Sequence, residues 1–177
     1  TVRSSHYPPS KHFLDRCDQI GLLVFNEIPG WQHIGNKQWQ EVAIDNVKEM
    51  IYRDYNHPSV FIWGVRINES PDNDEFYKET NRIAKLYDTT RPTGGVRNFA
   101  GSHLFEDVFT YNDFVHRGDN EGVVKAKKIS KKNVPYLVTE YNGHMYPTKK
   151  FDDEFHRENQ VKRHLKVQND SFKYDNV

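Results

Sequence analysis

The chain has 177 residues, of which 36% are hydrophobic, and its 25 basic side chains are balanced by 25 acidic ones. This length allows one hydrophobic core, and no segment reaches the ~18 apolar residues that a membrane span needs. A formal net charge of zero argues against nucleic-acid binding driven by phosphate contacts, and a single cysteine excludes an intrachain disulfide.

The first half of the chain alternates short apolar runs with amphipathic segments. Residues 1–5 are predicted to end a strand, and residues 11–20 to form a helix with Ser10 as its N-cap and Gly21 as its stop. The apolar residues 22–25 predict a strand that ends at Asn26 and Glu27. Residues 38–54 predict the longest helix, whose inner face is marked at helical spacing by Ile44, Val47, Ile51 and Tyr55.

The second half continues this alternation. The run from Val60 to Val65 is apolar and rich in β-branched residues, as in a strand buried on both faces. Ser70 and Pro71 predict the start of a helix that reaches about residue 87 and buries Phe76, Ile83, Ala84 and Tyr87. Further strands are predicted over residues 93–96, 108–111 and 136–139. Further helices are predicted over residues 121–132, with solvated lysines, and over residues 152–167, with Phe155, Val161 and Leu165 facing inward.

Six predicted strands separated by helices or loops indicate an α/β fold with a parallel sheet and right-handed crossovers. The third and the sixth of these strands each lead into a glutamate: Asn68 and Glu69 follow the third strand, and Glu140 follows the sixth. The residues that follow parallel strands meet at one rim of the sheet, where the sites of α/β enzymes form. Two carboxylates are the smallest constellation that hydrolyses a glycosidic bond.

Four segments resemble glycoside hydrolase family 2, the group of β-galactosidases, β-glucuronidases and β-mannosidases, and stand in the same order. They are VRSSHYPPS near the start, NEIPGWQHIG at residues 26–35, NHPSVFIWGVRINES at residues 56–70 and PYLVTEYNGHMYP at residues 135–147. The resemblance implies a (β/α) TIM barrel. A complete barrel needs ~250 residues, so we expect an incomplete barrel of about six strands that resemble strands two to seven.

The expected domain organisation follows from this resemblance. Residues 1–167 would form part of a glycosidase catalytic barrel, and residues 168–177 a polar tail. The first and last strands would each have one unpaired edge. We therefore expect either a distorted, open barrel or a homo-oligomer formed at those edges.

The resemblance assigns the two glutamates distinct roles. Glu69 resembles the general acid/base, although a glutamate before Ser70 is also common at the start of a helix. Glu140 resembles the nucleophile, and Arg3 and Tyr111 resemble the residues that hold it; a surface salt bridge and strand packing are the alternatives for these two. Carboxyl groups about 5–5.5 Å apart would indicate hydrolysis with retention of configuration.

Further residues resemble sugar-binding groups of the family. His6 would contact sugar hydroxyls, Asn68 would bond the hydroxyl beside the anomeric carbon, and Trp31 would provide an aromatic platform. Glu27 would be either a polar residue of the site or the salt-bridge partner of a barrel arginine such as Arg66 or Arg97. Weaker candidates, for which packing is the favoured account, are His144, Asn112 and Trp63.

No cofactor is expected. The best-known bacterial β-galactosidases have a glutamate and a histidine two residues apart that bind magnesium. Here His33 is present, but Trp31 stands at the glutamate position, which makes a magnesium ion doubtful. The remaining histidines show no spacing typical of a zinc site.

These observations predict a retaining exo-β-glycosidase, with a β-linked galactoside as the first substrate and neither nucleic acid nor membrane as a partner. The alternatives are a β-glucuronidase, a β-mannosidase, or an inert fragment that binds sugar weakly. An unrelated α/β hydrolase would need a Gly-x-Ser-x-Gly motif, which the sequence lacks. The first residues lack the apolar core of a secretory signal. A single cysteine is compatible with the cytoplasm, which is slightly favoured, and export stays the alternative.

Overall fold

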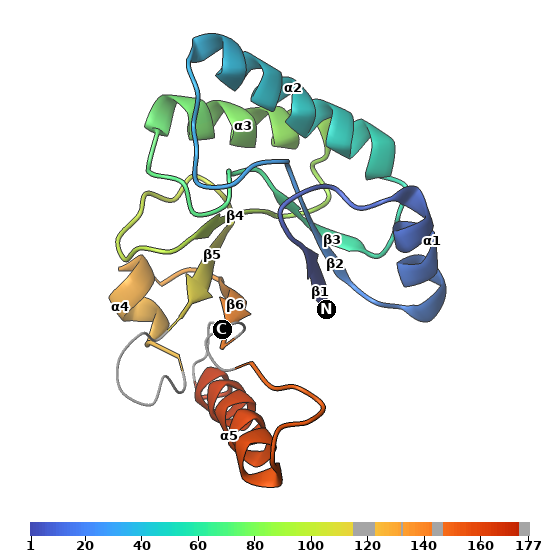
Figure 1. Ribbon diagram of the computed structural model, residues 1–177. Helices are drawn as coiled ribbons and strands as arrows, with labels where there is room; N and C mark the ends of the chain where they lie inside the picture. Colours follow the sequence, from blue (N-terminus) through green and yellow to red (C-terminus); the bar gives the residue numbers. More distant parts are fainter. Residues whose placement is uncertain (115–122, 132, 143–146, 174–177) are drawn as a thin grey trace.

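The computed structural model describes residues 1–114, 123–131, 133–142 and 147–173, and its centre is a sheet of parallel strands that follow one another in chain order (Figure 1). Each strand pairs in parallel with the next. The strands are β1 (Val2–Ser4), β2 (Val24–Glu27), β3 (Val60–Gly64), β4 (Thr93–Arg97), β5 (Val108–Asp113) and β6 (Tyr136–Tyr141). The sheet curls into a half-barrel, which confirms the predicted incomplete α/β barrel.

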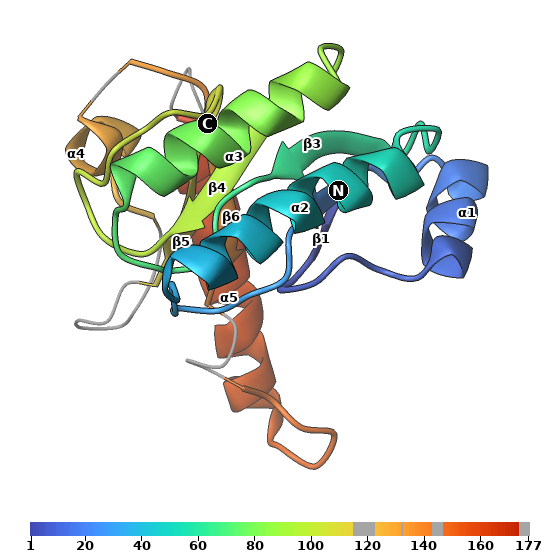
Figure 2. The ribbon, with the colours of Figure 1, turned by 90° about the horizontal axis from the view of Figure 1, so that it is seen from above.

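Helices connect most of these strands. They are α1 (Lys11–Ile20), α2 (Lys37–Asp54), α3 (Asp74–Tyr87), α4 (Ala126–Ser130) and α5 (Glu154–Ser171). Helices α2 and α3 lie side by side over the outer face of the sheet, whereas α5 lies apart from them beyond β6 (Figures 1 and 2). No helix in the described part of the chain combines the length and the apolar content needed to cross a bilayer.

The predicted caps of α1 are confirmed, but the predicted start of α3 is wrong. Ser10 accepts the Phe13 N–H at 3.3 Å, and Gly21 adopts a left-handed φ of 69°. At α3, Asn73 rather than Ser70 is the N-cap, because its side chain accepts a backbone N–H of the first turn. The Ser70 hydroxyl instead donates to the Ile67 carbonyl at 2.8 Å, so it cannot cap a helix.

The main core lies between the sheet and helices α1 to α3. Its apolar side chains come from the face of the sheet that these helices cover and from one stripe of each helix, as amphipathic helices over a parallel sheet require. Its buried members include Leu14, Val24, Val47, Ile51, Val60, Trp63, Val65, Ile67, Phe76 and Ala84. Tyr55 and Tyr87, predicted to be buried, are exposed because each lies at the carboxyl end of its helix.

The predicted inner face of the last helix is also wrong. Phe155, Val161 and Leu165 are 72%, 57% and 50% exposed, whereas α5 buries Val167 and Asp170. The position of α5 explains this exposure, since the helix lies beyond β6 and does not cover a face of the sheet as α2 and α3 do (Figure 1). The helix extends to Ser171, so part of the predicted polar tail is helical; the division at residue 167 stays a prediction.

Two other elements differ in extent from the prediction. The basic helix predicted over residues 121–132 is the short helix α4, and residues 121, 122 and 132 lie outside the described residues. In the described sheet, β1 and β6 each pair with one neighbour, as predicted. Oligomerisation through these edges stays a prediction.

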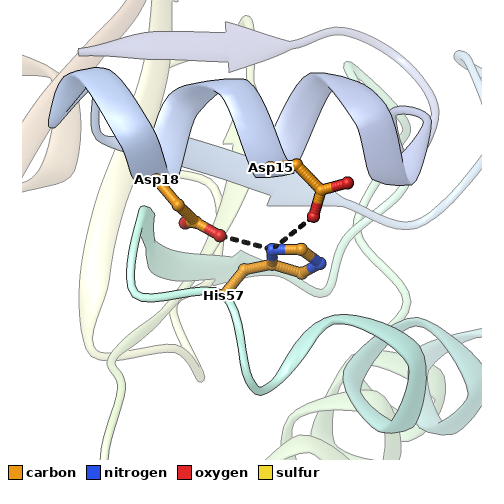
Figure 3. A group of neighbouring side chains, drawn as sticks. All are labelled: Asp15, Asp18 and His57. Atoms are coloured by element: carbon orange, nitrogen blue, oxygen red, sulfur yellow. Dashed lines mark hydrogen bonds and ion pairs between the residues drawn. The ribbon is translucent and has the colours of Figure 1, made fainter.

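A polar contact joins α1 to the turn that precedes β3, at the amino-terminal ends of the strands (Figure 3). The Nδ1 atom of His57 lies 2.6 Å from Asp18 Oδ2 and 4.0 Å from Asp15 Oδ1. The other oxygen of Asp18 accepts the Ser59 N–H at 2.9 Å. Burial raises the pKa of the Asp18 carboxyl, but hydrogen bonds from Ser59 and His57 outweigh it, and the net shift is downward.

Replacing Asp18 with asparagine is therefore expected to lower the free energy of unfolding by about 1–2 kcal/mol at pH 7. Because the folded-state pKa is depressed, this stability is present above the unfolded pKa and is lost as the pH falls through the folded value. Urea unfolding at pH 7 and pH 3 measures the loss of unfolding free energy and its decrease at low pH. Asp15→Asn, at a 55% exposed position, is the control and should cost less than about 0.5 kcal/mol; equal losses would contradict the assignment.

Candidate active site

Polar side chains from five strands or their following loops meet at the carboxyl-terminal rim of the sheet. The strand register places Arg3 of β1 beside Phe25 and pairs Asn112 of β5 with Glu140 of β6. Glu27 ends β2, and Asn68 and Glu69 follow β3. These residues, which the sequence singled out, therefore lie at one rim, because every strand runs in the same direction.

Arg3 lies at the centre of this cluster and contacts Glu27, Asn68 and Glu140. Its Nε and one terminal nitrogen donate to the two oxygens of Glu27 at 3.1 and 2.9 Å. The same terminal nitrogen donates to Asn68 Oδ1 at 2.8 Å, and the other donates to Glu140 Oε1. The side chains of Arg3 and Glu27 are only 7% and 1% exposed. A buried guanidinium with two carboxylate partners satisfies its charge and fixes the orientation of Glu140.

Asn112 links this cluster to Glu69. Its Nδ2 donates to Glu69 Oε1 at 2.9 Å and lies 3.5 Å from Asn68 Oδ1. The Thr139 hydroxyl donates to Asn112 Oδ1 at 2.9 Å, which fixes the orientation of the amide. Glu69 and Glu140, 71 residues apart in the chain, are thus connected through Arg3, Asn68 and Asn112.

The backbone of Glu69 adopts a left-handed conformation with a φ of 53°. Such a conformation costs on the order of 1 kcal/mol for a residue other than glycine. The Glu69 N–H donates to the Val96 carbonyl at 3.0 Å. Arg66, which is buried, donates to the Ser70 carbonyl at 3.0 Å and pairs with Asp72 at 2.7 Å. These contacts hold the segment on both sides of Glu69 and compensate for its strained conformation.

His6 and Trp31 border the cluster. His6 Nδ1 lies 3.1 Å from Arg3 and 3.5 Å from Glu27 Oε1. The rings of His6 and Trp31 are stacked, with centroids 6.3 Å apart and an interplanar angle of 14°. Trp31 is 58% exposed, so the structure leaves an aromatic surface beside the carboxylates.

A cavity of about 210 Å³ lies on the concave side of the half-barrel. Its lining comes from the first, second and sixth strands together with Phe61 of β3. The residues on this lining include Arg3, Phe25, Leu137 and Thr139. The cavity therefore reaches Arg3 from the interior of the curled sheet.

Several candidates make other contacts. The Tyr111 hydroxyl donates to the Asn98 carbonyl at 3.4 Å, and burial, followed by the charges of Asp113 and Glu69, raises the pKa of Tyr111. Trp63 is buried and donates its indole N–H to Asp88 at 2.9 Å, as the packing account predicted. His144 lies outside the described residues.

The suggested arginine partners of Glu27 are wrong. Arg66 pairs with Asp72 at 2.7 Å and Arg97 pairs with Glu106 at 2.6 Å, whereas Glu27 pairs with Arg3. The reason is proximity: β1 and β2 are neighbouring strands, so Arg3 and Glu27 meet at the rim without crossing the sheet.

Two residues at the site were missed from the sequence. Thr139 orients Asn112, and Gln32 donates to Glu69 Oε2 at 3.0 Å. Thr139 directly precedes Glu140, and Gln32 directly follows Trp31, so the position beside a candidate was the available signal. No local pattern shows which way such a side chain points.

Among the described residues of this rim, no three carboxylate or histidine side chains have their ligand atoms close enough together to hold one metal ion. The His33 ring packs edge-on against Trp39, with centroids 6.0 Å apart. In the described part of the chain, one group of carboxylates and histidine has ligand atoms close enough for a metal: Asp15, Asp18 and His57 (Figure 3). It lies at the opposite ends of the strands, and the hydrogen bond between Asp18 and His57 accounts for it.

Asp113, which ends β5 beside Asn112, is a buried carboxyl that accepts the Val124 N–H at 2.8 Å. Burial raises its pKa to about 6. A raised folded-state pKa means that stability falls as the pH rises from the unfolded value of about 4 to about 6.

Asp113→Asn is therefore expected to increase the free energy of unfolding at pH 7.5 by about 1–3 kcal/mol, with no gain below pH 4. Urea unfolding at both pH values measures the difference. Asp107→Asn is the control and should instead destabilise the protein at pH 7.5, because it weakens the acceptor of the Thr93 N–H at 2.8 Å. A gain for Asp113→Asn that is equal at both pH values would contradict titration as its cause.

The comparisons with known proteins agree with this fold. Residues 1–169 match the family described as glycosyl hydrolases family 2, TIM barrel domain. A β-galactosidase of Thermoanaerobacterium thermosulfurigenes is 58% identical over 99% of this chain and 25% of its own length. A putative β-glucuronidase of Formosa agariphila is 30% identical over 99% of this chain and 22% of its own. The chain thus spans about a quarter of these relatives.

A solved structure supports the fold. The family 2 β-galacturonidase of Eisenbergiella tayi, crystallised with galacturonate, superposes with a TM-score of 0.81 at 24% identity, over 99% of this chain and 35% of its own. The order of the parallel strands, the polar rim and the match over nearly the whole chain lead to one conclusion. The chain belongs to glycosyl hydrolase family 2 and lies in its TIM barrel domain.

Proposed function

We propose that this chain carries the catalytic carboxylates of a retaining exo-β-glycosidase that removes terminal β-galactosyl groups, with Glu140 as nucleophile and Glu69 as acid/base. The observation that carries the proposal is the hydrogen-bonded connection between the two carboxylates through Arg3, Asn68 and Asn112. A chain of direct contacts across four strands or their loops supports a shared task for these two side chains.

In the first step a Glu140 oxygen attacks the anomeric carbon while the bond to the leaving oxygen breaks and Glu69 gives its proton to that oxygen. In the second step Glu69 takes a proton from water, the water oxygen attacks the anomeric carbon, and the Glu140 carboxylate leaves. Arg3 keeps the Glu140 carboxylate oriented in both steps. Asn68, held by Arg3, is assigned to the hydroxyl beside the anomeric carbon, and Trp31 is assigned to the face of a substrate sugar.

A neutral sugar is favoured over a uronic acid by one feature of the rim. A uronate needs a cation for its carboxylate, and the Arg3 guanidinium is already paired with Glu27 and Glu140. The names of the more similar relatives, both β-galactosidases at 58% and 59% identity, support the galactoside. A β-glucuronidase remains the second candidate because a relative of that name is 30% identical, and a β-mannosidase the third.

The test compares nitrophenyl β-galactoside, β-glucuronide and β-mannoside as substrates. It uses this chain alone and a chimaera in which residues 1–177 replace the matching segment of the Thermoanaerobacterium thermosulfurigenes relative. We expect the chimaera to hydrolyse the galactoside at least tenfold faster than the other two. Release by the chimaera but not by the chain alone would support the inert-fragment alternative for the chain. Preference for the glucuronide would refute the galactoside assignment.

A further inference from the structure

Gln32 is a polar residue at the rim that the proposed function does not use. Its backbone is left-handed, with a φ of 58°, and its N–H donates to the Asn68 carbonyl at 2.7 Å. The His33 N–H donates to the Trp31 carbonyl at 2.7 Å, which closes a tight turn around Gln32. Trp31 and Asn68 also form an isolated β-bridge. These backbone contacts hold the loop after β2 against the segment that contains Glu69.

This turn points the amide of Gln32 at the candidate acid/base. Its Nε2 donates to Glu69 Oε2 at 3.0 Å, while Asn112 donates to Glu69 Oε1 at 2.9 Å. The two donors differ in their surroundings. Asn112 is buried and is itself held by Thr139, whereas Gln32 is exposed.

A general acid must present one carboxyl oxygen to the oxygen of the leaving group. The buried Asn112 amide occupies Oε1 of Glu69 and cannot leave without breaking its bond with Thr139. The oxygen that can turn toward a substrate is therefore Oε2, where Gln32 now donates. A bound substrate must share or displace that hydrogen bond.

We propose that Gln32 belongs to the subsite for the leaving group and exchanges its bond to Glu69 for one to a hydroxyl of that group. The proposal rests on the proposed function, since it takes Glu69 as the acid. A displaced amide beside exposed Trp31 can bond a sugar hydroxyl, while the indole covers the apolar face of the ring. The preferred leaving group is accordingly a sugar, and the preferred substrate a disaccharide.

The experiment uses the full chain labelled with ¹⁵N and follows the Gln32 side-chain amide and the Trp31 indole by NMR. The ligands are galactose and a lactose analogue with sulfur in the glycosidic linkage, which is not hydrolysed. We expect the indole signal to move with the lactose analogue and the Gln32 amide signals to move with this analogue but not with galactose. Gln32→Leu should weaken binding of the analogue about fivefold and leave binding of galactose unchanged.

Gln19→Leu is the matched control, because Gln19 is also a hydrogen-bonded glutamine, with Arg16 at 3.2 Å on α1, away from the rim. It should change neither affinity. If the Trp31 signal moves and the Gln32 amide signals do not, or if Gln32→Leu weakens binding of both ligands equally, the role of Gln32 is refuted. Sugar binding at the rim would still stand in either case. If neither signal moves with either ligand, both this role and sugar binding at the rim are refuted.

Discussion

Glu140→Gln is expected to lower galactoside hydrolysis by the chimaera at least about 10⁴-fold. The substitution keeps the shape of the side chain but removes the carboxylate that attacks the anomeric carbon, and removal of a nucleophile typically costs a factor of this size. Because Arg3 also pairs with Glu27 and Asn68, the rim should keep its geometry in the variant. The measurement is nitrophenol release from the β-galactoside, with circular dichroism to confirm folding.

The control for this prediction is Glu79→Gln on α3. Glu79 also pairs with an arginine, Arg82, at 2.7 Å, but on the helical surface. The same chemical change should leave the rate unchanged, so the two variants separate loss of a nucleophile from loss of an ion pair. A Glu140→Gln variant that retains a tenth of the activity, or an equal loss in both variants, would disprove the nucleophile assignment.

The fold and the shared rim could be predicted from the sequence because they depend on local signals. Apolar runs mark the strands, amphipathic segments mark the helices between most of them, and this alternation is typical of parallel strands. Once the strands are parallel, whatever follows each one lies at the same edge. This is why Asn68, Glu69 and Glu140 could be placed together without any knowledge of the packing.

Errors arose where the outcome depended on contacts between distant segments. Ser70 and Asn73 are both residue types that cap helices well. Asn73 is the N-cap because the Ser70 hydroxyl instead donates to the Ile67 carbonyl and hydrogen-bonds with the Tyr77 hydroxyl. Phe155, Val161 and Leu165 are predicted to face inward, but they are exposed because α5 lies beyond β6 and does not cover the sheet. Periodicity shows that a face is apolar, and it does not show what covers that face.

The same limit applies to the candidate site. The resemblance selected Arg3, and the structure adds that this guanidinium contacts Glu27, Asn68 and Glu140 together. Gln32 had no comparable signal, because its role depends on a left-handed turn after β2 and on a partner 37 residues away. Which side chains of a loop point at a carboxylate is decided by such turns, and local composition does not encode them.

Glu69→Ala is expected to lower hydrolysis of lactose by the chimaera about 10²–10⁴-fold, because the sugar leaving group needs a proton. The first step with dinitrophenyl galactoside should be affected much less, because a dinitrophenolate leaves without protonation. The glycosyl intermediate on Glu140 should then accumulate, since the base for water is missing. A burst of dinitrophenolate followed by slow turnover would show this accumulation.

Azide distinguishes the two carboxylates, because a small anion can attack the anomeric carbon without a general base. In Glu69→Ala it should attack the intermediate from the face that water normally uses, restore turnover and give the β-galactosyl azide. In Glu140→Ala it should take the place of the nucleophile on the opposite face and give the α-galactosyl azide. Glu79→Ala, in which both carboxylates remain, should give no azide product. If the configurations of the two products are interchanged, the roles of Glu69 and Glu140 are interchanged, and if neither variant responds to azide, the two glutamates do not form the catalytic pair.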